Sequence, residues 1–183
     1  TAASGIQFQH SQKDFIDFNV QKLLPHKLSA YTPALATADV DGNGLEDVVC
    51  GGTSSSGTAA FLQQADGTFI TKMIVAAIPE PPATGFETVG YKHKDAGLLL
   101  FDADGDGDQD LYAASGGYEF APNTPAYGDR FYVNDGKGNF RQDSMALPQN
   151  FTSKFCVRAA DVDADGDLDL FVSGRVDPWH YPR

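Results

Sequence analysis

The sequence has little glutamate, few basic residues and no long hydrophobic run. Only four of its 25 acidic residues are Glu, they stand against 13 Lys and Arg, and the net charge of the 183-residue chain is −12. An acidic chain argues against nucleic acid as a partner. No apolar segment approaches the roughly 20 residues of a membrane-spanning helix. We therefore expect neither nucleic-acid binding nor direct membrane insertion.

Cysteine and histidine are also scarce. Cys50 and Cys156 allow at most one disulfide, and because both lie in predicted strands we favour buried free thiols. The four histidines show no metal-ligand spacing, which favours surface or packing roles. With 42% hydrophobic residues, the chain is too apolar for a disordered acidic tail and is expected to fold.

The acidic residues are concentrated in three nine-residue segments, 39–47, 102–110 and 161–169, named here loops 1, 2 and 3. They hold 14 of the 25 acids and no Lys or Arg, so the rest of the chain is close to neutral. Asp prefers turns and helix caps, whereas Glu is a good helix former. The excess of Asp therefore predicts structured loops rather than acidic helices.

The loops begin 63 and 59 residues apart, a period typical of repeat proteins. Each lies between two short apolar stretches, rich in β-branched and aromatic residues, that predict strands. Asp66-Gly67 and Asp135-Gly136 predict hairpin turns later in the first two repeats. Four antiparallel strands in about 60 residues form one blade of a β-propeller. Residues 11–24 come closest to a helical pattern, but their apolar spacing is too irregular to predict a helix.

We predict an all-β fold, a partial β-propeller of about two and a half four-stranded antiparallel blades with Asp-rich calcium loops. One partial propeller domain spans residues 1–183, with an entry segment at 1–29 and repeats at approximately 30–75, 96–145 and 154–183. Because closed propellers have ~4–8 blades, we expect the sequence to be part of a longer protein. The open blade edges are expected to allow self-association.

Alternate positions of each loop carry side-chain oxygens that a tight turn would direct toward one centre. Gly at position 6 permits the sharp turn, and the carbonyl at position 7 completes a set of hard oxygen ligands. Calcium takes 6–8 such oxygens, whereas zinc prefers His or Cys. We predict up to three Ca²⁺ ions, whose binding is coupled to folding because the carboxylates repel one another. The predicted ligands are Asp39, Asp41, Asn43, Leu45 and Asp47 in loop 1; Asp102, Asp104, Asp106, Asp108 and Asp110 in loop 2; and Asp161, Asp163, Asp165, Asp167 and Asp169 in loop 3.

Other interpretations of the loops explain less. Ordinary Asp/Gly surface turns would account for one copy but not for three with the same ligand positions. The loops match the start of an EF-hand, yet position 12 lacks its Glu and the flanks predict strands. Paired carboxylates could serve glycoside hydrolysis, but the pairs here are already assigned to metal. We predict no catalytic residue and leave enzymatic activity open.

The segments Asp102–Gly117 and Asp161–Gly174, together with the later Asn134–Phe140, resemble the FG-GAP/VCBS repeat. Asp39–Gly52 differs mainly at Asn43, which lowers the charge of that site. The stretches 24–29, 115–120 and 174–176 resemble a bacterial exported subgroup with ASPIC/UnbV-type C-terminal domains. The resemblance covers the chain from about Gly5 to Pro182. It implies an integrin α-chain-like, calcium-binding propeller that is seven-bladed when complete.

This resemblance implies an extracellular or cell-surface protein used in adhesion or ligand binding without catalysis. The ligand is an unknown protein or carbohydrate; the alternative is a segment of a polysaccharide-degrading enzyme. The aromatic-bearing connections 76–95 and 117–129 are candidate binding surfaces, although simple packing explains them better. Gly51-Gly52 and Ser54–Ser56 lack phosphate-loop and nucleophile-elbow patterns and are interpreted as flexible connections.

Overall fold

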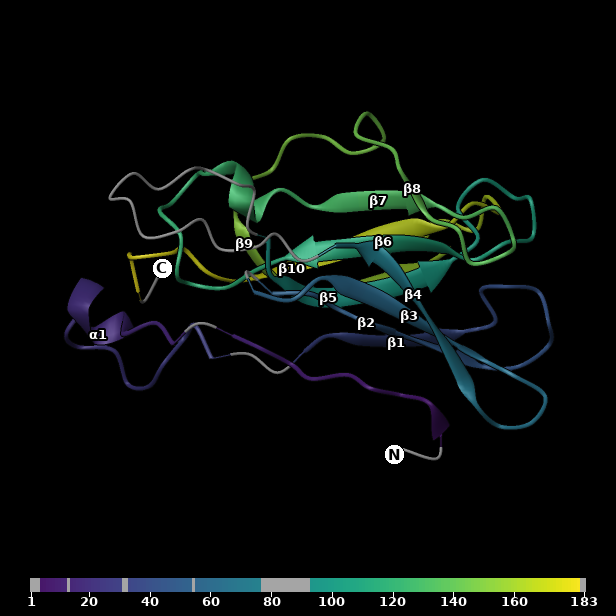
Figure 1. Cartoon of the computed structure of the whole chain (residues 1–183). Helices are drawn as coiled ribbons and strands as arrows, with labels where there is room; N and C mark the ends of the chain where they lie inside the picture. Colours follow the sequence, from purple (N-terminus) through teal and green to yellow (C-terminus); the bar gives the residue numbers. More distant parts are fainter. Residues whose placement is uncertain (1–3, 13, 31–32, 54, 77–92, 182–183) are drawn as a thin grey trace.

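The protein consists of antiparallel strands stacked in three sheets, with almost no helix (Figure 1). The structure, a computed structural model, describes residues 4–12, 14–30, 33–53, 55–76 and 93–181. Strands follow one another in chain order within each sheet, which confirms the expected all-β class and its antiparallel four-stranded sheets. The first sheet holds β1 (Leu35–Ala38), β2 (Asp47–Cys50), β3 (Thr58–Gln63) and β4 (Phe69–Val75); the second holds β5 (Asp95–Phe101), β6 (Asp110–Ser115), β7 (Arg130–Val133) and β8 (Arg141–Gln142); the third pairs β9 (Ser153–Ala160) with β10 (Asp169–Val176).

The first two sheets each end in a hairpin at the Asp-Gly turns that the sequence predicts. Gly67 and Gly136 adopt positive φ angles of 79° and 69°, a conformation open to glycine at little cost. In the β3–β4 turn, Gln64 N donates to Thr68 O at 2.8 Å. The local turn chemistry therefore determines where these strands reverse.

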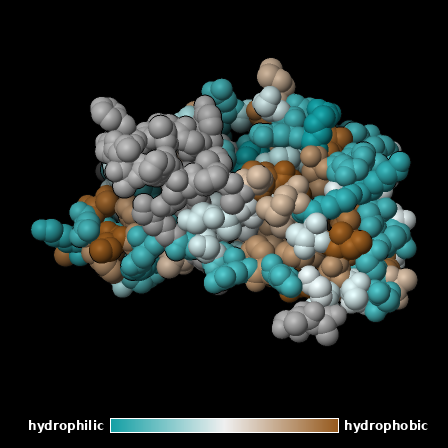
Figure 2. All heavy atoms as spheres, viewed as in Figure 1, coloured by the Kyte–Doolittle hydropathy of each residue, from teal (hydrophilic) through white to brown (hydrophobic). Residues whose placement is uncertain are grey.

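The described residues include the short helical segments α1 (Asp17–Val20), which precedes β1, and η2 (Pro125–Tyr127), which lies between β6 and β7. The expectation that residues 11–24 contain no helix is wrong for the single turn of α1. The fully buried Asp17 carboxylate accepts hydrogen bonds from Leu28 N and Ser29 N, so a tertiary contact anchors this turn. No helix in the described ranges is long and apolar enough to cross a membrane. Figure 2 shows hydrophobic side chains on the surface beside α1, where Leu23 is 91% exposed.

The sheets pack face to face through apolar side chains. Val49 and Leu62 of the first sheet meet Leu111 and Tyr132 of the second, and the second and third sheets share a separate apolar cluster. On the outer face of the first sheet, Phe8 of the N-terminal segment packs edge-on against Phe61 at 5.8 Å between ring centroids. The layer order is therefore N-terminal segment, first sheet, second sheet and third sheet.

The glycine pair after β2 lies at a close contact between sheets, not in a flexible connection as the sequence suggested. Gly51 N donates to Ala34 O at 2.8 Å, and Gly52 N donates to Asp95 Oδ2 at 2.7 Å. A Cβ atom on Gly51 would lie 2.7 Å from the Cβ of Asp95, so only glycine fits. Ser54 lies outside the described residues.

Both cysteines are free thiols, as favoured from the sequence. Cys50 is buried on the face of the first sheet that the N-terminal segment covers. Burial raises the pKa of its thiol, because the charged thiolate is poorly solvated there. Cys156 is only half-buried, so the expectation of two buried thiols holds fully for Cys50 alone.

The buried Asp95 carboxylate forms an ion pair within the second sheet and connects it to the first sheet, at the end away from the acidic loops. The Arg130 guanidinium binds the Asp95 carboxylate, whose side chain is 1% exposed. Asp95 Oδ2 also accepts hydrogen bonds from Gly52 N and Thr58 Oγ1, each at 2.7 Å. Three elements from two sheets therefore depend on this one carboxylate.

His93 lies beside this ion pair and is expected to make stability depend on pH. Burial, and then the nearby Arg130 charge, lower its pKa from 6.5 to about 4. Since the folded pKa is below the unfolded one, the unfolded chain binds the proton first, and stability falls as the pH drops from about 6.5 toward 4. When the pH is lowered from 7 to 5, the free energy of unfolding should fall in both proteins. The fall should be about 1–2 kcal/mol smaller in the His93→Gln variant than in the unsubstituted protein. Urea unfolding at both pH values, at one calcium concentration, measures this; parallel pH profiles would contradict it.

Candidate metal centres

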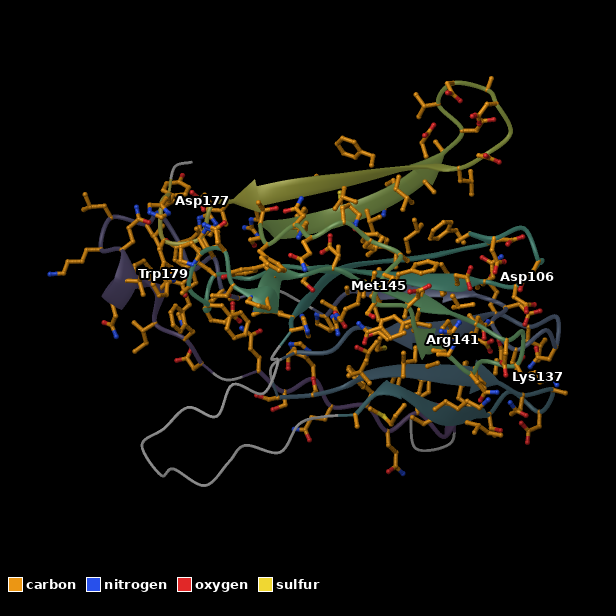
Figure 3. All side chains as sticks on the ribbon, turned by 90° about the horizontal axis from the view of Figure 1, so that it is seen from above. Asp106, Lys137, Arg141, Met145, Asp177 and Trp179 are labelled. Carbon is orange, nitrogen blue, oxygen red and sulfur yellow. The ribbon has the colours of Figure 1, made fainter. Side chains whose placement is uncertain are left out.

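The three acidic loops lie together at one end of the molecule. Loop 1 joins β1 to β2, loop 2 joins β5 to β6, and loop 3 joins β9 to β10, all at the right of Figure 1. Hydrophilic surface dominates this end in Figure 2. Figure 3 places Asp106 there, with Asp177 and Trp179 at the opposite end. Because β5 packs beside both β1 and β9, the stacking of the sheets aligns the loops.

Each loop curls around the carboxylate at its first position. Asp39 Oδ1 accepts a hydrogen bond from Gly42 N at 2.8 Å, and its Oδ2 accepts one from Gly44 N at 2.7 Å. Asp102 accepts equivalent bonds from Gly105 N and Gly107 N. In loop 3, Asp161 accepts from Asp165 N and Gly166 N. Backbone donors thus fix the curvature of all three loops.

Two positions in each loop require left-handed backbone. Position 6 is Gly44, Gly107 or Gly166, with φ between 83° and 98°, as the expected sharp turn needs. Position 4 is left-handed as well, a requirement that the sequence analysis missed although Gly42 and Gly105 signal it. Loop 3 has Ala164 there at φ 62°, which costs about 1 kcal/mol relative to glycine.

Within the described chain, three carboxylates gather in each loop, with one oxygen of each within 4.8 Å of the others. Positions 1 and 3 take part every time. Position 9 completes loops 1 and 3, whereas position 5 completes loop 2. The clusters are Asp39, Asp41 and Asp47; Asp102, Asp104 and Asp106; and Asp161, Asp163 and Asp169. The carboxylates of Asp110 and Asp165 lie outside these three-carboxylate clusters, as do those of Asp108 and Asp167, whose predicted ligand is the backbone carbonyl.

The carboxylate at position 9 also closes the loop. Asp47 is fully buried, and its two oxygens accept hydrogen bonds from Val40 N at 2.9 Å and Gln63 N at 2.7 Å. Asp110 makes the same pair of contacts to Ala103 N and Asn134 N. Burial raises the pKa of both carboxyl groups. Since each oxygen has two lone pairs, position 9 can still face a cation.

The contacts of Asn43, at position 5 of loop 1, explain why this loop has an amide where the other two loops have a carboxylate. Asn43 Oδ1 accepts a hydrogen bond from Leu45 N at 2.8 Å, the contact that Asp106 makes with Asp108 N in loop 2. Asn43 Nδ2 donates to Gln63 O at 2.9 Å. A carboxylate oxygen in that place would face a carbonyl oxygen, so the amide preserves the turn and removes the repulsion.

The chemistry of the loops fits a hard cation. The pKa of Asp108 is raised by desolvation and by the neighbouring negative charges, of which that of Asp106 is the largest. These like charges create a negative potential that a cation would relieve. The clustered side chains offer only carboxylate oxygens, which suit calcium or magnesium better than zinc.

The two other candidate surfaces have different outcomes. In the 117–129 connection, Tyr118 and Tyr127 are fully buried, and Tyr127 Oη donates to Phe120 O at 2.9 Å. Tyr118 Oη donates to Gln21 Oε1 at 2.7 Å. The aromatic residues of this connection therefore support packing, as favoured from the sequence. Most of the 76–95 connection, residues 77–92, lies outside the described residues.

Comparison with known families finds one described as FG-GAP-like repeat, which matches residues 39–113 and 102–172. The matched ranges together contain all three loops and cover most of the chain. No curated protein matches the sequence. The FG-GAP part of the resemblance is confirmed, while the VCBS repeat and the ASPIC/UnbV-associated subgroup stay predictions.

Proposed function

Because the chain belongs to the FG-GAP-like repeat family, we propose that it is a calcium-binding β-propeller segment of a secreted or cell-surface protein. The observation that carries the proposal is the threefold repetition of a carboxylate cluster between the first two strands of successive antiparallel sheets. A single acidic turn has many explanations, whereas three clusters with shared positions 1 and 3 favour a common ligand.

Calcium is the cation that the loops suit best. Short Asp side chains on a tightly curled backbone supply several hard oxygens, and the backbone between them tolerates the variable geometry that calcium accepts. When bound, the ion would neutralise charge and hold each loop in one conformation. Outside cells, sites with dissociation constants of about 10⁻⁴–10⁻³ M are filled by ambient calcium.

The propeller proposal is supported by the form of the sheets. Each of the first two is a four-stranded antiparallel meander, the arrangement of a propeller blade. The third, two-stranded sheet corresponds to the first half of a blade. We assign the segment to adhesion or to binding of a protein or carbohydrate ligand, without catalysis.

A calcium titration followed by calorimetry tests the metal claim. We expect three ions per chain with dissociation constants of about 10⁻⁴–10⁻³ M. Substituting Asp39→Asn together with Asp41→Asn should remove one ion, because two of the three clustered carboxylates of loop 1 are neutralised. Asp66→Asn with Asp143→Asn removes the same charge outside the loops and should leave three. Absence of saturable binding up to 10 mM calcium, or an unchanged stoichiometry in the loop variant, would contradict the proposal.

A further inference from the structure

Asn134, directly after β7, connects two acidic loops that belong to different sheets. Its side chain is buried, 4% exposed. The amide Nδ2 donates one hydrogen bond to Val40 O of loop 1 at 2.8 Å and another to Gln109 O of loop 2 at 3.1 Å. Both amide protons are thus satisfied, one by each loop.

The rest of the Asn134 residue strengthens the connection to loop 2. Its backbone N donates to Asp110 Oδ1 at 2.9 Å, so the carboxylate at position 9 holds the residue in place. Its Oδ1 accepts a hydrogen bond from Asp135 N at 2.9 Å, which fixes the orientation of the amide. The direction of the two N–H groups is therefore determined by loop 2 and by the turn that follows.

The turn after Asn134 lies against both loops. A Cβ atom on Gly136 would lie 2.5 Å from either carboxylate oxygen of Asp108 in loop 2. On the other side, a Cβ atom on Gly42 of loop 1 would lie 3.2 Å from Gly136 O. Loops 1 and 2 therefore contact the same short segment, and movement of one displaces the support of the other.

We propose that Asn134 is a positioning residue that couples cation binding in loop 1 to cation binding in loop 2. The proposal rests on the proposed function of the loops. A cation that orders loop 2 fixes Gln109 O and the Asp110 carboxylate, and these contacts hold Asn134 with one N–H directed at Val40 O. Loop 1 then begins from a more ordered state and loses less conformational entropy when its own cation binds. By linkage the effect is reciprocal.

Loop 3 provides an internal reference. Among the described residues, its backbone N–H groups donate to the carboxylates of Asp161, Asp163, Asp165 and Asp169, all within the loop. In the described part of the chain, no asparagine bonds loop 3 to another loop as Asn134 bonds loop 1 to loop 2. We expect the third site to bind its cation independently of the other two.

The test measures the calcium affinity of loop 2 by calorimetry, in the 183-residue chain with loop 3 disabled by Asp161→Asn and Asp163→Asn. Disabling loop 1 with Asp39→Asn and Asp41→Asn should weaken calcium binding at loop 2 at least ~5-fold. In a chain that also carries Asn134→Ala, the same loop 1 substitutions should weaken calcium binding at loop 2 less than ~2-fold. Any weakening that remains in the Asn134→Ala chain comes from the two negative charges removed from loop 1, and high salt screens this electrostatic effect.

Asn139→Ala is the matched control, because Asn139 lies in the same turn and bonds Asp135 and Lys72 rather than either loop. It should leave the coupling intact. If Asn134→Ala does not fold, Asn134→Leu replaces it, since it fills nearly the same volume without adding a charge and has no N–H to donate. Equal fold-changes with and without the Asn134 amide would overturn the coupling while leaving the sites in place. If the protein without any of these substitutions binds no calcium, the proposed function itself is overturned.

Discussion

Removing calcium with a chelator should lower the melting temperature of this protein by roughly 10–25 °C relative to 10 mM calcium. With dissociation constants of about 10⁻⁴–10⁻³ M, each occupied site stabilises the folded state by about 1.4–2.7 kcal/mol. Three sites together contribute about 4–8 kcal/mol. For a chain of this length each kcal/mol moves the midpoint by about 2–4 °C.

The sign of this effect follows from the composition of the loops. Each holds four or five acidic residues and no basic one, so an ion-free loop concentrates like charges that unfolding would separate. A chain with Asp→Asn at positions 1 and 3 of all three loops provides the comparison. It should melt at the same temperature with and without calcium.

Thermal melts followed by circular dichroism measure both expectations. Magnesium at the same concentration should give a smaller shift than calcium, because it needs a stricter octahedral geometry and dehydrates reluctantly. Equal midpoints of the unsubstituted protein in chelator and in calcium would contradict calcium-stabilised folding.

Replacing Asp95 by alanine should destabilise the fold by about 3–5 kcal/mol. The substitution leaves the Arg130 guanidinium, whose side chain is 7% exposed, as a buried charge without its carboxylate. It also removes the acceptor of the hydrogen bonds from Gly52 N and Thr58 Oγ1. Because these donors connect the first two sheets, the loss falls on the contact that stacks them.

Urea unfolding of three variants distinguishes the charge from the shape at this position. Asp95→Asn keeps an acceptor of nearly the same size and should cost less than Asp95→Ala. Asp143→Ala, at a partly exposed position directly after β8, loses the hydrogen bond from Met145 N and should change stability by no more than about 1 kcal/mol. A cost below about 1 kcal/mol for Asp95→Ala would show that the Asp95 carboxylate does not hold the first two sheets together.

Local sequence patterns were sufficient for the strands and for the loops between them. Apolar runs on both sides of each Asp-rich segment predicted β1 to β2, β5 to β6 and β9 to β10, and Asp-Gly placed the hairpin turns. Glycine at position 6 indicated the left-handed backbone. These features depend on residues within about ten positions of one another, where backbone sterics and turn chemistry act directly.

Contacts between distant residues could not be predicted in the same way. Asn134 and Val40 are 94 positions apart, and no local pattern distinguishes a bridging asparagine from an ordinary turn residue. The same holds for Asp17, whose partners order α1, and for the double role of Asp47 as cluster member and loop closure.

The sequence by itself determined the repeated unit, its strands and the acidic composition of its loops, because each is encoded within a short segment. Only the tertiary structure decided how the units stack, why Gly51-Gly52 must be small, and which carboxylates gather in each loop. The physical reason is that side-chain packing and buried hydrogen bonds depend on which surfaces meet. In this chain those surfaces come from different repeats.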